Sequence, residues 1–175
     1  GGGVGGVGGT AACVSFVVGG FPGLSPALHR AERGFDVVLL EAHRVGFGAS
    51  GRNGGQLGSG QRMEQDGLEK LVGQDDATKL WQLAEDSKEL VKGLISKHNI
   101  NCHYKPGIAH ACFSAKEVRE EHEYAEHLQT RYSYDQIEPL DPDALQSNSP
   151  YPNYVGGALD LGPGHRHPPG ARPRL

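Results

Sequence analysis

Several features that would place this chain of 175 residues in a special class of protein are missing from its sequence. No apolar run approaches the roughly 18 residues that a membrane-spanning helix needs, and no basic segment precedes an apolar one as in a secretory signal. The net charge is only −4, with acidic and basic residues intermixed, so we expect neither nucleic acid nor a membrane as a partner. The sequence leaves the oligomeric state open.

Cysteine is also scarce. The three cysteines are Cys13, Cys102 and Cys112, an odd and sparse set that forms no disulfide framework and is typical of a reducing cytoplasm. Cys102 and Cys112 lie close in sequence to His103 and His110, which raises a zinc hypothesis. Their spacing matches neither C-x-x-C nor H-x-x-x-H, so we interpret them as small core cysteines and half-exposed histidines and assign no metal site.

Glycine, by contrast, is abundant, and its 27 residues are unevenly spread. Residues 1–10 (GGGVGGVGGT) are of low complexity. They cannot form a packed element, because glycine loses much conformational entropy on ordering and buries no side chain. Residues 168–175 (PPGARPRL) lack any periodicity. We interpret the first segment as a disordered leader and the second as an irregular tail.

Residues 16–41 (FVVGGFPGLSPALHRAERGFDVVLLE) have the order strand, Gly-rich turn, helix, turn and strand. We expect a buried strand over residues 11–18, a helix over 24–33 and a second, parallel strand over 35–40. This is the half-unit in which the pyrophosphate of a dinucleotide lies at a helix N-terminus.

Three glycines and an acid carry this cofactor hypothesis. Gly20 and Gly23, next to Gly19, let the backbone approach phosphate and let the helix pack closely on the strand. Glu41 ends the second strand, where a carboxylate can accept the hydroxyl hydrogens of an adenosine ribose. Val18 occupies the first glycine position of G-x-G-x-x-G, and it would be strained if the turn needed a positive φ. An ordinary strand–turn–helix without a cofactor is the alternative.

A second Gly-rich segment, residues 43–61 (HRVGFGASGRNGGQLGSGQ), follows. Its polar core is the run Ser50, Gly51, Arg52, Asn53 and Gly54. A hydroxyl, a guanidinium, a carboxamide and backbone amides can therefore converge on one ligand. A solvated linker is the alternative interpretation, but linkers seldom contain an R-N-G-G core between small residues.

Residues 66–97 follow a helical pattern, for which Asp75 or Asp76 can provide a cap. The apolar positions expected to face the core are Leu80, Leu83, Ala84, Leu90, Val91, Leu94 and Ile95. Trp81 is expected to anchor this helix against a sheet.

The remaining elements are shorter. Residues 100–113 alternate around Lys-Pro-Gly and predict two short strands joined by a turn. Ser114 and Glu117 form a capping box that opens a charged helix to about Tyr132. Residues 155–161 (VGGALDL) predict a further strand.

The stretches VVGGFPGLSPALHRAERGFDVVLLEA and GFGASGRNGGQLGSGQ resemble the start of a D-amino-acid-oxidase-like FAD-dependent oxidoreductase. The segments LWQLAEDSKELVKGLI, YKPGIAHA, YAEHLQTRY, YDQIEPLD and GGALDLGPGHRHP are similar to the gamma-glutamylputrescine oxidase branch of that family. The likeness covers roughly residues 14–168, and GASGRNGG is its most specific part.

This resemblance implies an α/β fold class. Residues 11–65 would be the N-terminal part of a Rossmann-like FAD-binding fold, and residues 66–167 a partial α+β substrate domain. FAD would be the cofactor, with its pyrophosphate at Gly19, Gly20 and Gly23 and its adenosine ribose at Glu41. The loop that contains Ser50, Gly51, Arg52, Asn53 and Gly54 would line the phosphates and the flavin.

The resemblance also implies a reaction, the oxidation of a small amine such as a gamma-glutamyl polyamine in putrescine catabolism. Hydride would pass to the flavin, the imine would hydrolyse, and oxygen would reoxidise the cofactor to give peroxide. The sequence identifies no general base. A nicotinamide-dependent dehydrogenase is a competing interpretation, but the GASGRNGG loop fits the longer reach of FAD.

Members of this family are more than twice as long as this chain, so we expect a truncated or frame-shifted copy. The alternative function is therefore a non-catalytic remnant of a dinucleotide-binding module. A sheet with only its first strands would leave an exposed edge and an uncovered apolar face. We expect marginal stability and a tendency to aggregate, and a sharp two-state melt of the monomeric protein without FAD would contradict this.

Overall fold

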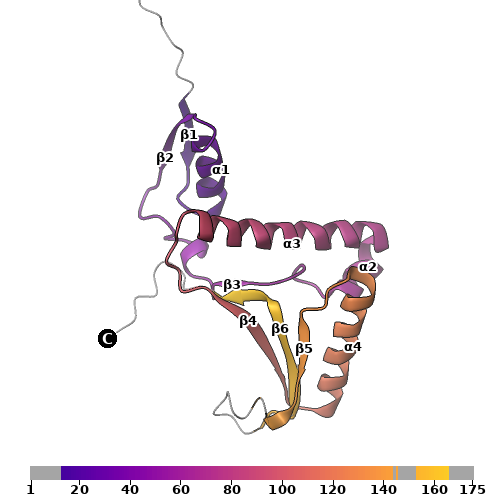
Figure 1. The fold of residues 1–175 in the computed structure, drawn as a ribbon. Helices are drawn as coiled ribbons and strands as arrows, with labels where there is room; N and C mark the ends of the chain where they lie inside the picture. Colours follow the sequence, from indigo (N-terminus) through magenta and orange to yellow (C-terminus); the bar gives the residue numbers. More distant parts are fainter. Residues whose placement is uncertain (1–12, 144, 146–152, 166–175) are drawn as a thin grey trace, which may run out of the picture. The chain divides into compact units, whose positions relative to one another are not determined.

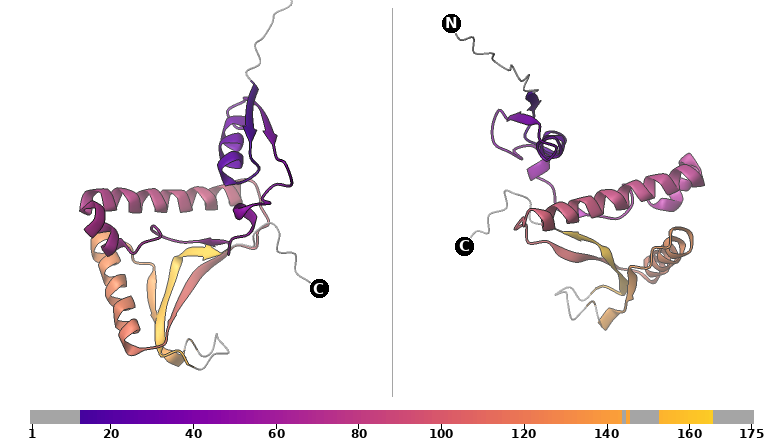
Figure 2. Two further views of the ribbon diagram at one scale, coloured as in Figure 1. Left: turned by 180° about the vertical axis from the view of Figure 1, so that it is seen from behind. Right: turned by 45° about the horizontal axis from the view of Figure 1, so that its top comes forward.

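The computed structural model describes residues 13–143, 145 and 153–165. These residues fall into two compact units, 13–53 and 54–165, which are described separately. Figures 1 and 2 show their helices and strands. The leader expected over residues 1–10 and the tail expected over 168–175 lie outside the described residues. No helix in the described part of the chain is long and apolar enough to span a membrane.

The first unit is a single β–α–β half-unit. Its elements are β1 (Cys13–Val17), α1 (Phe21–Ala31) and β2 (Asp36–Leu40), with β1 and β2 paired in parallel. The predicted order and pairing are confirmed. The helix begins at Phe21 and not at Leu24. Pro22 is tolerated in the first turn because the N–H groups there have no partner inside the helix, so its missing N–H costs no hydrogen bond.

The first strand of this unit is not buried as predicted, and the second strand is also largely exposed. Val17 is 72% exposed and Leu40 is 54% exposed, and Phe35 and Val38 are also exposed. The physical reason is that α1 is the single helix that packs on the pair among the described residues, so much of the apolar surface of the strands has no partner. The uncovered apolar surface expected from the sequence is therefore present.

The sheet of the second unit is built around its last strand. Its strands are β3 (Gln56–Leu57), β4 (Lys105–Cys112), β5 (Ile137–Leu140) and β6 (Gly156–His165). The strands β3, β4 and β5 all pair with β6, and every pairing is antiparallel (Figure 1). The strand predicted over residues 155–161 is confirmed and extends to His165.

The prediction of two short strands over residues 100–113 is wrong. The chain forms one strand there, and its register against β6 shifts between Pro106 and Ile108. Gly107 lies at this point with φ +91°. The Lys-Pro-Gly sequence therefore makes a bulge in one strand and does not reverse the chain.

Three helices complete the second unit, α2 (Gln65–Val72), α3 (Gln74–Lys97) and α4 (Ala115–Tyr132). The predicted helical region is broken at Gly73, whose φ of +83° ends α2 and makes it the N-cap of α3. Asp75 and Asp76 lie in the first turn and do not cap it, so that prediction is wrong. The predicted Ser114 cap of α4 is confirmed, since the Glu117 amide donates to Ser114 Oγ at 3.2 Å, while the Glu117 carboxylate accepts from the Phe113 amide at 2.7 Å.

The core of the second unit is aromatic. Trp81 is 5% exposed and clusters with Leu128 and Tyr134, with the Trp81 and Tyr134 rings edge to face at 5.2 Å. The predicted apolar stripe on α3 is only partly buried, because Leu83 is 59% exposed and Leu90 is 49% exposed. Few described elements cover that side of the helix, so its spacing alone overestimated the core.

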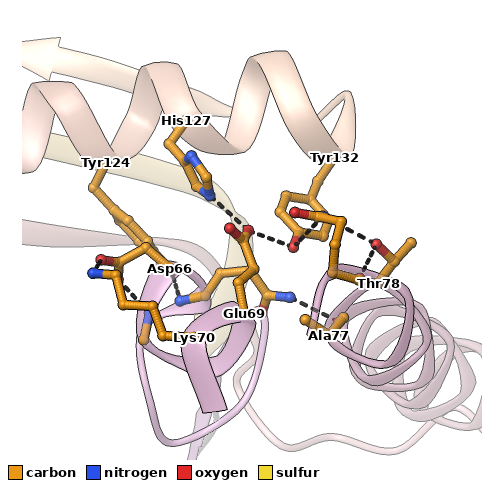
Figure 3. A network of polar contacts seen from close by, with 11 residues as sticks. Asp66, Glu69, Lys70, Ala77, Thr78, Tyr124, His127 and Tyr132 are labelled. Atoms are coloured by element: carbon orange, nitrogen blue, oxygen red, sulfur yellow. Dashed lines mark hydrogen bonds and ion pairs between the residues drawn. The ribbon is translucent and has the colours of Figure 1, made fainter. Parts of the chain in front are cut away.

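Polar contacts join α2 to α3 and α4 (Figure 3). His127 Nε2 lies 2.7 Å from Glu69 Oε1, and the Tyr132 hydroxyl donates to the same oxygen at 2.6 Å. Burial alone would raise the pKa of Glu69, but these two partners outweigh burial and lower that pKa. The buried Gln65 donates through Nε2 to the Ala77 carbonyl at 2.8 Å. These contacts hold α2 in place although it is only 8 residues long.

We expect Leu128→Ala to lower the free energy of unfolding of the second unit by about 2–5 kcal/mol, because it leaves a cavity beside Trp81. Trp81 is the sole tryptophan of the chain, so its fluorescence during urea denaturation reports this change. Leu83→Ala on the exposed side of α3 is the control and should shift the free energy by less than about 0.5 kcal/mol. Equal effects of the two variants would contradict the assigned core.

Candidate functional site

The turn between β1 and α1 is closely packed. Gly20 is the N-cap of α1, and no acidic side chain lies in the first turn of the helix. The positive end of the helix dipole therefore has no carboxylate of its own there. A Cβ atom on Gly23 would lie only 1.9 Å from the Val18 carbonyl oxygen. Only glycine lets the helix approach the strand this closely, which is the packing role expected for it.

Val18 does not strain this turn. The described residues other than glycine that have a positive φ are Asn99, His103 and Ser133. The turn glycines Gly19, Gly20 and Gly23 have no positive φ either. The missing first glycine of the fingerprint therefore imposes no left-handed conformation on a β-branched residue.

Glu41 lies directly against the turn. Its Oε2 accepts a hydrogen bond from the Gly19 amide at 2.6 Å, and its Oε1 accepts one from the His43 amide at 3.0 Å. The His43 amide and then the Gly19 amide hold the pKa of the Glu41 carboxyl below its ordinary value. Each carboxylate oxygen has two lone pairs, so both retain capacity for a further donor such as a ribose hydroxyl.

Ser50 joins the second Gly-rich segment to the helix. It lies in a short 3-10 helix, η1 (Ala49–Gly51), and its Oγ accepts a hydrogen bond from the Phe21 amide at 3.0 Å. A Cβ atom on Gly20 would lie 2.9 Å from this hydroxyl oxygen. The hydroxyl that the sequence offered to a ligand therefore also satisfies a first-turn N–H of α1.

Asn53 shapes the same loop. Its Nδ2 donates to the Ala49 carbonyl at 3.1 Å and to the Ser50 carbonyl at 3.0 Å. A Cβ atom on Gly51 would lie 2.1 Å from the Gly46 carbonyl oxygen, so glycine is needed at this crossing. Both residues act on the backbone conformation of the loop.

Arg52 and Gly54 lie apart from these contacts. The Arg52 guanidinium lies 4.7 Å from the centre of the Phe47 ring. Gly54 is the first residue of the second unit. Sequence reasoning missed His43, which binds Glu41, and Gly46, whose amide donates to the Gly19 carbonyl at 2.8 Å. These are backbone contacts, for which a residue type gives little signal.

The second unit contains a polar centre that the sequence did not reveal. Lys88 is 3% exposed and donates to Glu85 Oε2 at 2.6 Å and to Ser59 Oγ at 2.7 Å. The Tyr134 hydroxyl donates to Asp160 Oδ1 at 2.5 Å and lies 2.8 Å from Ser59 Oγ. Burial, and then the bond to Asp160, raises the pKa of Tyr134, and burial raises the pKa of Asp160. Lys88 gave no signal because it sits in a charged helix.

The zinc hypothesis finds no geometry to support it. No group of three or more His, Cys, Asp or Glu side chains among the described residues could hold a metal ion. His110 lies 3.8 Å from Glu121, and Cys112 is buried.

The turn between β1 and α1 and the Glu41 carboxylate lie together in the first unit. The turn leaves no room for a Cβ at Gly19, Gly20 or Gly23, because Glu41, Ser50 and Val18 fill those positions and form the surface beside the helix N-terminus. An ionised carboxylate with spare acceptor capacity, Glu41, borders this surface. This is the arrangement of glycines and an acid that the sequence predicted for a dinucleotide half-unit.

Comparison with known proteins supports this interpretation. The model of a family described as FAD dependent oxidoreductase (DAO) matches residues 17–173. Gamma-glutamylputrescine oxidoreductase of Escherichia coli (strain K12) is 42% identical over 155 residues, which are 89% of this chain and 36% of that protein. Probable oxidoreductase OrdL of Rhizobium meliloti (strain 1021) is 37% identical over 155 residues, with the same shares. The chain thus spans about a third of the length of these relatives.

Solved structures show the same fold. Glycine oxidase from Bacillus cereus ATCC 14579 matches with a TM-score of 0.57 and 22% identity over 89% of this chain and 41% of that chain. L-Amino acid deaminase from Proteus myxofaciens matches with a TM-score of 0.65 and 21% identity over 88% of this chain and 33% of that chain. These matches confirm the predicted fold class, part of an α/β fold of the FAD-dependent oxidase type.

Gly23→Ala is expected to destabilise the first unit by about 3 kcal/mol or more, because its methyl group would overlap the Val18 carbonyl. Gly48→Ala is the matched control, since a Cβ there meets nothing within 4 Å. Hydrogen exchange of the α1 amides, followed by mass spectrometry, measures the difference. If the α1 amides were equally protected from exchange in the Gly23→Ala and Gly48→Ala variants, the close packing of α1 on β1 would be wrong.

Proposed function

We propose that this chain, which belongs to the FAD-dependent oxidoreductase (DAO) family, serves the FAD-dependent oxidation of a small amine. FAD is the cofactor of this family. The single observation that carries the proposal is the turn in which the Gly19 amide binds the Glu41 carboxylate beside the N-terminus of α1. The amine is inferred from the 42% identity to gamma-glutamylputrescine oxidoreductase of Escherichia coli.

The pyrophosphate of FAD would lie against the backbone of Gly19, Gly20 and Gly23. The positive end of α1, whose first turn carries no acidic side chain, favours an anion. Glu41 would accept hydrogen bonds from the adenosine ribose, because its oxygens are fixed by two backbone amides and remain ionised.

The loop residues Ser50, Gly51, Arg52, Asn53 and Gly54 would line the phosphates and the flavin. Two of them already make hydrogen bonds that stabilise the first unit. Ser50 caps α1, and Asn53 folds the loop back on itself. Arg52 carries a guanidinium that lies over the Phe47 ring and would turn from there to bind a phosphate or a flavin oxygen.

When bound, FAD supplies the two-electron oxidation of the carbon that carries the nitrogen. The part of this chain is to bind and orient the cofactor, and no described residue is assigned as a general base. A gamma-glutamyl polyamine is the proposed substrate class, with putrescine catabolism in the cytoplasm as the proposed setting. The predicted division at residues 65 and 66 into a cofactor portion and a substrate portion belongs to the same proposal.

A dinucleotide-binding module without catalysis is the second candidate function. The observation that favours it is the position of the proposed cofactor residues, which all lie between Gly19 and Gly54, while no described residue is assigned as a general base. Such a module would bind FAD but would produce no peroxide from an amine.

Titration of the purified 175-residue chain with FAD tests the proposal. We expect saturable binding in the micromolar range with a perturbed flavin spectrum. Glu41→Gln should weaken binding about tenfold, because one charge-assisted acceptor is lost. Asp36→Asn removes the same charge from the start of β2 and should leave binding unchanged.

No saturable binding, or equal affinities of the two variants, would contradict the proposed cofactor site. If FAD binds, a peroxide assay with amines separates the two candidates, since only an oxidase forms peroxide.

A further inference from the structure

The second unit contains a cavity of about 480 Å³ that the proposed FAD site does not use. Its apolar lining consists of Met63, Trp81, Ile108, Tyr124, Leu128 and Ile137. The size lies within the range of roughly 300–1,000 Å³ that is usual for small-molecule sites. Two aromatic rings and several aliphatic side chains in one cavity provide a surface for an alkyl chain or an organic cation.

Three carboxylates also line this cavity, together with Arg62 and His110. Asp160 on β6 lines it, and both of its recorded hydrogen bonds, from Tyr134 and from the Gly162 amide, fall on Oδ1. Its Oδ2 therefore retains acceptor capacity for a donor in the cavity. Glu64 and Glu121 also line the cavity.

Glu64 and Glu121 also line an adjoining groove of about 900 Å³. The other carboxylates that line this groove are Asp66, Glu117, Glu120 and Glu123, and its described lining contains no lysine or arginine. Lys70 pairs with Asp66 and Lys116 pairs with Glu120. The groove is therefore lined by six carboxylates, of which two pair with a lysine, and its net charge is negative. A negatively charged groove raises the local concentration of cations.

We propose that this cavity, which we call the amine cavity, binds an aliphatic molecule that carries two ammonium groups. Its alkyl chain would lie against Trp81 and Tyr124. One ammonium group would donate to Asp160 and the other to Glu121. The inference deepens the proposed function and rests on it for the choice of an amine, but the cavity itself lies wholly in the second unit.

Other occupants fit less well. An uncharged apolar molecule would cover Asp160 and leave its Oδ2 without a donor, which costs free energy. An anion would meet the carboxylates of the cavity and of the groove, against Arg62 and His110 as the opposing groups in the cavity lining. A short cation without an alkyl chain would pair with the carboxylates but would leave the Trp81 and Tyr124 rings exposed to water.

Trp81 makes the proposal directly measurable, because the sole tryptophan of the chain lines the amine cavity. The experiment is a fluorescence titration of the full 175-residue chain with putrescine, without FAD. We expect a saturable change in Trp81 emission that weakens as salt is added. Butanediol of equal chain length is the uncharged control and should cause no saturable change.

Glu121→Gln is the main variant, since Glu121 on α4 lines both the cavity and the groove, and its side chain is 27% exposed and lies 3.8 Å from His110. It should weaken putrescine binding about tenfold. Glu89→Gln, at a 65% exposed position on α3 outside both lining sets, is the matched control and should bind like the parent.

Absence of a saturable change, an equal response to butanediol, or equal affinities of Glu121→Gln and Glu89→Gln would each overturn the proposal. FAD binding to the first unit is measured separately by flavin absorbance on the same samples. A failed amine titration with intact FAD binding would refute the amine cavity alone, and the reverse result would refute the FAD site alone.

Discussion

The hydrogen bond between the Gly19 amide and the Glu41 carboxylate is the contact on which the first unit depends. It joins the end of β2 to the turn after β1, and at 2.6 Å it is a short, charge-assisted bond. The Gly19 carbonyl in turn accepts the Gly46 amide, so the same residue also fixes the start of the second Gly-rich segment. Without a side chain at Gly19 the carboxylate can approach this closely, since a Cβ there would lie 2.7 Å from Oε2. The proposed cofactor contact and the local fold of the first unit thus use the same atoms.

The helices of the second unit are held together largely by polar contacts. These helices have few buried apolar side chains. Glu69 joins α2 to α4, and Lys88 joins α3 to the segment after β3 through Ser59. A buried lysine with carboxylate and hydroxyl partners contributes geometric specificity more than net stability. The aromatic cluster around Trp81 provides the apolar burial that these contacts position.

The sequence predicted well what local pattern determines. The parallel β–α–β unit and the Ser114 cap of α4 follow from residue order and short-range chemistry. It failed where tertiary contacts decide. Gly107 could open a turn or a bulge, and the pairing of β4 with β6 selects the bulge. Leu83 has the right spacing for a core position, but few described elements cover it. Lys88 and Asp160 lie far apart in sequence, so no local motif predicts that they meet in a buried polar centre.

The central place of β6 in its sheet has a consequence for the order of assembly. Among the described strands of the second unit, β3, β4 and β5 pair with β6 and not with one another. During synthesis on the ribosome, β6 emerges after all three. The earlier strands must therefore wait with unpaired backbone amides and carbonyls while only α2, α3 and α4 can form by local contacts. The interval before the last strand arrives is the time at which this unit is most exposed to misassociation and most in need of a chaperone.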